Sequence, residues 1–137
     1  IMIEMVHDAR IVPLDGRGPL DDSIRLWSGD SRGYWDGETL VVESRNFNGL
    51  TQSFGAGGTS DTKFLIERFT RLSDDSIAYE FTVDDPQAYT DKITGIIPLT
   101  KVDGLLYEYA CHEGNYGLLN ILRGARAEEA RATESAR

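Results

Sequence analysis

Residues 108–117, EYACHEGNYG, gather most of the side chains that could carry acid and base chemistry in this chain. Glu108, His112, Glu113 and Tyr116 lie within this stretch, and the whole sequence has only two histidines. A histidine can act as a general base or a metal ligand near neutral pH, and a nearby carboxylate can orient its ring. Tyr116 could donate a hydrogen bond to charge that develops during a reaction. The stretch predicts a small-molecule hydrolase or lyase, with His112 as base or metal ligand and Glu108 or Glu113 as acid or orienting group.

A metal site with two imidazoles would have to pair His112 with His7, the other histidine of the chain. Asp8, Glu108 or Glu113 could complete such a site with oxygen ligands. Mixed nitrogen and oxygen ligands suit zinc, manganese or iron, so a divalent metal is a candidate cofactor. The alternative is that His112 is a structural residue, hydrogen-bonded at the end of a strand.

Glutamates recur inside otherwise apolar segments, at Glu43, Glu67, Glu80 and Glu108. Alternation along a strand places Glu108 and His112 on the same face. If that face lines a cavity, Glu80 on a neighbouring strand would join them, and mutual repulsion would raise a carboxyl pKa toward use as a general acid. The alternative is a solvated sheet face, on which glutamates are ordinary surface charges.

Large aromatic residues indicate a second kind of site, one that binds a ligand without chemistry. Trp27, Tyr34 and Trp35 lie beside a glycine-rich bend and could stack a sugar or an aromatic ligand, and Tyr107 and Tyr109 could line a binding cavity with the tryptophans. Because large aromatics also fill the cores of small β proteins, we expect at least one of Trp27, Tyr34 and Trp35 in the core. Arg32 is a further candidate for ligand binding, with an ion pair to Asp30 as its alternative role.

These residues favour, as the alternative to an enzyme, a lipocalin-like protein that binds a small ligand in an apolar pocket. A third class is a structural or assembly domain whose exposed strands recruit partners.

The elements that would position these residues are mostly strands. Apolar and polar residues alternate in several short segments separated by turn residues, which predicts an antiparallel meander. The strands are expected at residues 39–46, 63–72, 76–85, 92–102 and 105–111, with a further strand near residues 1–5. Asp36 and Gly37 predict a tight hairpin turn, and residues 24–37 a structured bend. The fold class is mainly β: a curved sheet or small lipocalin-like barrel with one C-terminal helix.

Helical periodicity begins only near the C-terminus, where Leu118, Leu119, Ile121 and Leu122 share a face. It predicts a helix over about 116–130, packed by that face, and a frayed tail to residue 137. A length of 137 residues is typical of one domain, so we predict a single domain over 1–137.

The charge balance argues against some partners. The net charge is −9 and the pI about 4.6, and binding to nucleic acid or to anionic lipid depends on clustered lysine and arginine. We therefore expect no nucleic acid partner and a small neutral or cationic ligand. The sequence has no apolar run of about 18 residues, which predicts no membrane span.

Three segments carry a resemblance: GDSRGYWDGETLVVESRNFN, ERFTRLSDDSIAYEFTVDDP and LLYEYACHEGNYGLLNILRGARAEE. Together they resemble the C-terminal portion of a family of exported bacterial proteins without an established activity. The resemblance implies a β-rich fold and an extracytoplasmic location, periplasmic or secreted, but it assigns no catalytic residue. Residues 1–10 lack a basic leader, so we expect no signal peptide there. Longer family members also imply that a second copy could supply a missing strand, which predicts a homodimer.

Overall fold

The computed structural model describes residues 1–5, 8–50, 60–110, 113–114 and 116–135. The chain divides into two compact units. Unit 1 comprises Ile1–Met2 and Ala9–Leu105, and unit 2 comprises Ile3–Asp8 and Leu106–Arg137. The prediction of a single domain over 1–137 stays a prediction.

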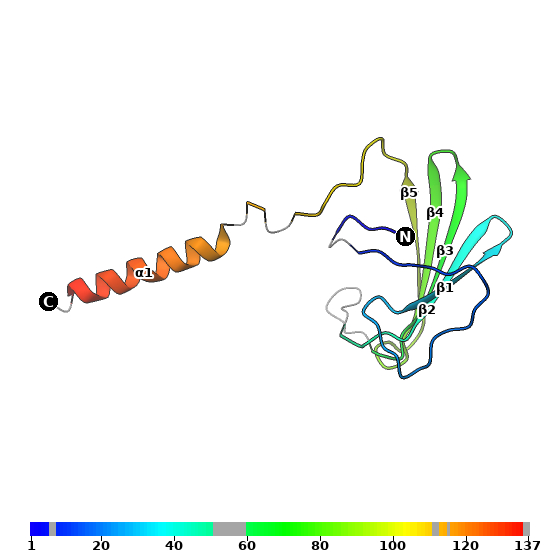
Figure 1. Ribbon diagram of the computed structural model, residues 1–137, viewed down its shortest axis with the longest axis horizontal. Coiled ribbons are helices and arrows are strands. Elements are labelled where there is room, and N and C mark those ends of the chain that lie inside the picture. The colour runs from blue at the N-terminus through cyan, green and yellow to red at the C-terminus, as the bar shows by residue number, and fades with distance from the viewer. Residues whose placement is uncertain (6–7, 51–59, 111–112, 115, 136–137) are drawn as a thin grey trace. The chain divides into compact units, whose positions relative to one another are not determined.

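Unit 1 contains one antiparallel sheet of five strands in the order β1-β2-β3-β4-β5, each paired with the next along the chain (Figure 1). The strands are β1 (Asp30–Asp36), β2 (Thr39–Arg45), β3 (Phe64–Ser73), β4 (Ser76–Asp84) and β5 (Ile93–Thr100). The predicted meander is confirmed for β2 to β5. Its short turns include Gly37, whose φ of 61° fits the left-handed conformation that tight hairpin turns require.

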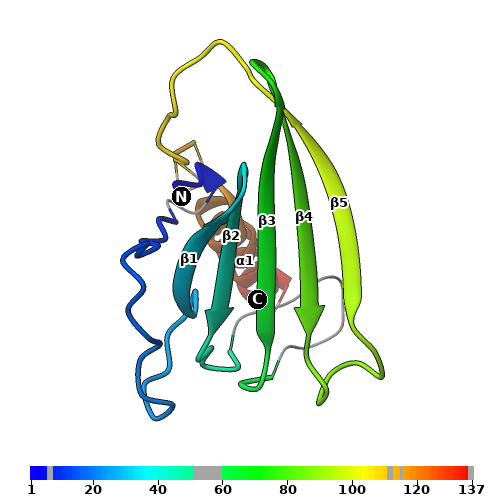
Figure 2. The same ribbon diagram turned by 90° about the vertical axis from the view of Figure 1, so that its right-hand side faces the viewer.

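The sheet is open, so the lipocalin-like barrel is not formed: β1 and β5 lie at opposite edges and do not pair. Figure 2 shows the five strands as a twisted sheet viewed onto its face. Pro98 lies in β5, and proline fits an edge strand because it has no N–H to donate to a further neighbour.

The register gives the sheet two different faces. We call one of them the apolar face, and its side chains form four rows that run across the strands. From the β2–β3 end to the β3–β4 turn, the first two rows are Ser31, Ser44, Leu65, Val83 and Ile93, and then Gly33, Val42, Glu67, Phe81 and Gly95. The last two rows are Trp35, Leu40, Phe69, Tyr79 and Ile97, and then Arg71, Ile77 and Leu99. The opposite face carries most of the charged side chains, among them Arg32, Glu43, Arg68 and Glu80. The buried apolar core consists of Val41, Val42, Phe47, Phe81 and Val83.

Strand β1 was missed by the sequence analysis, which predicted only a bend over residues 24–37. Glycines at 29 and 33 suggested a turn, but Gly33 is needed for packing: a Cβ there would lie 2.7 Å from Val12 Cγ1 and 2.6 Å from Leu14 Cδ2. The Gly33 N–H donates to the Pro13 carbonyl at 3.0 Å, so the N-terminal segment descends beside β1 (Figure 2). The close approach of that segment, which is a tertiary contact, explains a glycine inside a strand.

Asn46 ends β2 in the left-handed conformation, with a φ of 59°. Its side-chain amide donates to the carbonyls of Leu20 and Asp21 at 3.2 and 3.1 Å. This residue therefore joins the loop that precedes β1 to the end of β2, and the backbone hydrogen bond from the Leu26 N–H to the Asn46 carbonyl adds a further link.

Unit 2 contains the helix α1 (Gly117–Ser135). The predicted helix is confirmed and extends about one turn beyond its expected end, since Ala, Arg and Glu at 125–134 all favour helix. Its apolar side chains Leu118, Leu119, Ile121 and Leu122 are exposed. The predicted strand at 105–111 is wrong for residues 105–110, which form no strand, and Cys111 lies outside the described residues. In the described part of the chain, no helix is long and apolar enough to cross a membrane.

Candidate functional site

The apolar face is covered unevenly from one end to the other. Val42, Glu67 and Phe81 in its middle are buried, whereas Trp35, Ile77, Ile97 and Leu99 toward the β3–β4 turn are exposed. Exposed apolar side chains that gather on one face mark interaction sites more often than scattered ones do. We call this region, with the β3–β4 turn, the hairpin-end surface.

An irregularity in β3 shapes this surface. The pairing of β3 with β4 shifts by one residue between Arg71 and Ser73, which makes Leu72 an extra residue in the strand. Such bulges bend a strand and re-aim its side chains, and they are common beside binding sites. Leu72 is exposed as a result and joins the apolar side chains of the hairpin-end surface.

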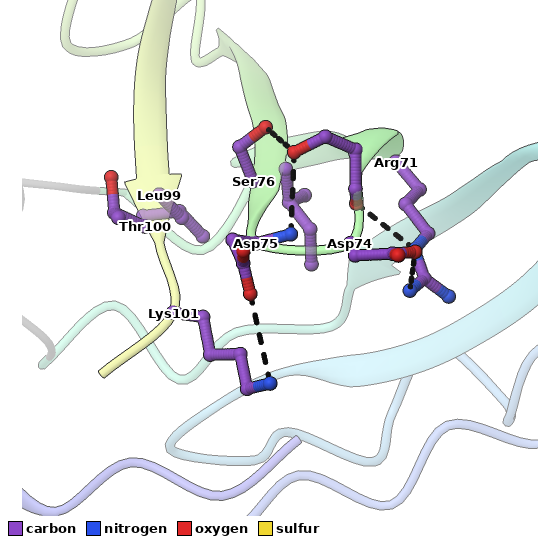
Figure 3. A pocket seen from close by; sticks show the side chains of 9 residues that line it. Arg71, Asp74, Asp75, Ser76, Leu99, Thr100 and Lys101 are labelled. Atoms are coloured by element: carbon purple, nitrogen blue, oxygen red, sulfur yellow. Dashed lines mark hydrogen bonds and ion pairs between the residues drawn. The ribbon is translucent and has the colours of Figure 1, made fainter. Parts of the chain in front are cut away.

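A hollow of about 370 Å³ lies against the β3–β4 turn (Figure 3). Its apolar part comes from Ile77 and Leu99, on β4 and β5. Its charged rim is paired: Arg71 Nη2 lies 3.0 Å from Asp74 Oδ1, and Lys101 Nζ lies 3.6 Å from Asp75 Oδ1. The residues that complete its lining are Ser73, Ser76 and Thr100. Because acids neighbour both cations, the hollow favours an uncharged molecule over an ion.

A second hollow, of about 560 Å³, adjoins the first and shares Arg71, Ser73 and Asp74 with it. Trp35 of β1, Leu72 and the β1–β2 turn complete its lining. The Trp35 side chain is 61% exposed. An exposed indole beside a hollow offers a flat surface on which a ring can stack.

The middle of the apolar face holds a buried polar cluster. The Arg10 guanidinium donates two hydrogen bonds to Glu67, at 2.6 and 2.9 Å, and the Tyr79 hydroxyl donates to Glu67 Oε1 at 2.8 Å. Glu67 is only 3% exposed. Burial, together with the Glu67 carboxylate, raises the pKa of Tyr79 above its ordinary value. The carboxylate oxygens are occupied by protein donors, so the cluster joins the N-terminal segment to β3 and β4.

The expectation that at least one of Trp27, Tyr34 and Trp35 lies in the core is wrong, because all three are exposed. Trp27 is 64% exposed and Trp35 61%. The core is filled instead by valines of β2 and β4 and by Phe47 and Phe81. Trp35 lines the second hollow, whereas Trp27 lines none of the three hollows described for unit 1.

Arg32 forms the ion pair that was its alternative role, with its Nη1 2.5 Å from Asp30 Oδ1. Its Nε also donates to the Gly18 carbonyl at 2.9 Å. Glu80 lies opposite Arg68 on the charged face of the sheet. Glu43 shares that face and Glu67 the apolar one, so the recurrent glutamates of unit 1 do not line a common cavity.

The residues of the EYACHEGNYG stretch belong to unit 2. Glu108, Tyr109, Glu113 and Tyr116 are exposed there. His7 and His112 lie outside the described residues, so their roles as base or metal ligands stay predictions. Across residues 1–5, 8–50, 60–110, 113–114 and 116–135, no three His, Cys, Asp or Glu side chains form a cluster suited to a metal ion.

Sequence reasoning missed Arg71, Leu72 and Leu99 as residues of the hairpin-end surface. Alternation had correctly placed Ile77, Tyr79, Phe81 and Val83 on one face of β4. The same alternation continues into the neighbouring strand as Ile93, Ile97 and Leu99, and this run of apolar residues was the signal that could have indicated an exposed apolar face.

Comparison with protein-family models, with curated proteins and with solved structures gave no match. The resemblance to exported bacterial proteins, and the extracytoplasmic location that it implies, therefore stay predictions.

Proposed function

We propose that this protein binds a small, largely uncharged ligand at the hairpin-end surface. The observation that carries the proposal is the exposure of Trp35, Ile77 and Leu99 beside two adjoining hollows on the apolar face. Ligand sites are typically concave and mostly apolar, with a few polar groups that fix orientation. The proposal keeps the binder predicted from the aromatic residues, but places it on an open sheet instead of inside a barrel.

The charges of the surface define the ligand class. Arg71 neighbours Asp74 and Lys101 neighbours Asp75, so neither the acids nor the cations dominate. A charged ligand would compete with these pairs, whereas an uncharged ring could stack on Trp35 and cover Ile77 or Leu99. We infer a flat, apolar molecule with few polar groups.

Binding can be tested with N-phenylnaphthylamine, an uncharged dye that accepts excitation energy from tryptophan. The dye should quench tryptophan emission in the wild-type protein and in Trp27→Phe, which keeps Trp35. Trp35→Phe should lose most of the quenching, and Leu99→Asp should weaken binding by roughly tenfold. Equal loss of quenching in the two tryptophan variants, or no binding by the wild type, would refute the proposed site.

The hydrolase or lyase stays a prediction, because its histidines lie outside the described residues. Elemental analysis of wild-type protein, His7→Ala and His112→Ala tests its metal-assisted form. A stoichiometric metal that both variants lose would support it. Without a metal, a panel of chromogenic esters, phosphoesters and glycosides would test for chemistry that needs none, with His112→Ala as the inactive control.

A further inference from the structure

Lys63 is an unusual lysine because its side chain is buried. It directly precedes β3, and only 9% of the residue is exposed. Lysine rarely gives up its hydration unless an anion or a hydrogen-bond acceptor replaces the water. The surroundings of the ammonium group therefore indicate what it is for.

Among the residues that the structure describes, this ammonium group has an aromatic ring beside it and no hydrogen-bond acceptor. Nζ lies 4.0 Å from the centroid of the Phe47 ring. It has no hydrogen bond or ion pair to any residue in the described part of the chain. The attraction of a cation to an aromatic ring is weaker than the cost of removing that ion from water, so the ring alone does not compensate for the burial of Lys63.

Asp85 attracts the ammonium group without pairing with it. Its carboxylate is 1% exposed and already accepts hydrogen bonds from the Ser60 N–H at 2.8 Å and the Ser60 hydroxyl at 2.5 Å. Burial lowers the pKa of Lys63, and Asp85 offsets only part of that shift. The Lys63 cation thus lacks a hydrogen-bonded counter-charge within the described structure.

Lys63 lines a cavity of about 330 Å³ in which two arginines also take part, Arg25 and Arg45. Arg25 Nη1 donates to the Asp61 backbone carbonyl at 2.9 Å, which leaves the other guanidinium N–H groups without an acceptor in the described residues. Arg45 lies over the Phe64 ring, with its Cζ 5.1 Å from the centroid. The remaining lining residues are Asp22, Asn46, Asp61, Thr62 and Phe64.

We propose that this cavity binds the oxyanion group of a small molecule, a carboxylate or a phosphate, with Lys63 as its main ligand and Arg25 and Arg45 at its rim. Three cations and two carboxylates line the cavity, so its lining carries one net positive charge although the chain as a whole carries −9. Two further carboxylates, Asp85 near Lys63 and Glu43 at 3.9 Å from Arg45, lie outside this lining. An oxyanion would accept the hydrogen bonds that Lys63 and Arg25 do not make with the described part of the protein.

This site is separate from the proposed ligand site. Lys63, Arg45 and Asn46 lie where β2 ends and β3 begins, whereas the hairpin-end surface lies where β3 ends and β4 begins (Figure 2). The cations also differ: Arg71 and Lys101 form ion pairs with carboxylates, whereas Lys63 forms no ion pair with any residue that the structure describes. The anion site therefore does not depend on the proposed function.

Isothermal titration calorimetry with inorganic phosphate and with acetate, at constant ionic strength, tests the inference. Both anions are small enough for the cavity, and chloride at the same ionic strength measures non-specific charge effects. We expect phosphate, acetate or both to bind the wild type. Lys63→Met keeps the apolar stem over Phe47 and should weaken binding by at least about tenfold. Arg25→Gln, a change at an exposed side chain, should weaken it several-fold.

Lys92→Met is the matched control, because Lys92 is exposed, pairs with Asp84 and lines none of the three hollows described for unit 1. It should bind the anions as the wild type does. The proposal is overturned if wild-type protein binds neither anion, or if Lys63→Met and Arg25→Gln bind as tightly as Lys92→Met. Circular dichroism of each variant establishes that it is folded, and loss of binding in a folded Arg25→Gln supports the site even where Lys63→Met does not fold.

Discussion

At the scale of single residues, two buried charges are handled in opposite ways. Glu67 is saturated, since Arg10 and Tyr79 together donate three hydrogen bonds to it. Lys63 is also buried, but its ammonium group lies over the Phe47 ring and makes no hydrogen bond or ion pair with the residues that the structure describes. A saturated buried charge fixes structure, whereas an unsaturated one is suited to an external partner.

Removal of one partner from the buried pair should be costly. Arg10→Met leaves the Glu67 carboxylate buried with only Tyr79 as a donor, and we expect a loss of about 3–5 kcal/mol in the free energy of unfolding. The double variant Arg10→Met, Glu67→Leu removes both charges and should recover most of that loss. Urea denaturation of the wild type, both single variants and the double variant measures the coupling. Additive losses would show that the pair is not coupled.

Lys63 should also leave a signature in the pH dependence of stability. Its pKa in the folded protein lies below the ordinary value of 10.5, so the unfolded chain binds more protons between those two values. Stability should therefore rise with pH as 10.5 is approached, and Lys63→Met should lack this rise. The groups near Lys63, namely Asp85, Asp61, Arg25 and Arg45, remain in both proteins. Thermal unfolding of wild type and Lys63→Met across this range tests the prediction, and parallel curves would contradict it.

At the scale of elements, the strands β2 to β5 were predicted correctly because apolar and polar residues alternate along them and turn residues separate them. Residues 64–73 and 76–84 pair through a short turn, so alternation and turn residues were sufficient. Strand β1 and residues 105–110 were assigned wrongly for opposite reasons. The strand at 30–36 was missed because its glycine was taken as a sign of a turn. A strand was predicted at 105–110 because the residues alternate, but no strand forms there.

Gly95 shows how packing between strands constrains an element. A Cβ at this position would lie 2.5 Å from Phe81 Cζ, so the ring covers the glycine. We expect Gly95→Ala to displace the ring and lower the free energy of unfolding by about 1–3 kcal/mol. Gly104→Ala is the control, because nothing lies within 4 Å of a Cβ there. Denaturation midpoints measure both changes, and equal effects would contradict this role of the glycine.

At the scale of the whole molecule, the open sheet leaves an edge strand, β5, through which the predicted homodimer could form. Residues 93–99 of the edge strand β5 carry no charge, and Ile93, Ile96, Ile97 and Leu99 are exposed. An uncharged apolar edge can pair with the same edge of a second copy. We therefore expect the molar mass from light scattering to rise with concentration, and Ile96→Lys to abolish the rise. Leu72→Lys, away from this edge, should not, and a constant monomer mass in the wild type would contradict the prediction.

The amino-acid sequence by itself determined the features that depend on residues close together along the chain. These are the strands β2 to β5 and their antiparallel arrangement, the turn at Gly37, the C-terminal helix and the face of β4 that carries Tyr79. The ion pair of Asp30 and Arg32 was also within reach, because the two residues are close along the chain. Only the tertiary structure decided that the sheet is open, that Arg10 meets Glu67 across 57 residues, and that Lys63 is buried without an acceptor among the described residues. Burial and charge compensation arise between segments distant in sequence, and the pattern within one strand carries no information about which segment will cover it.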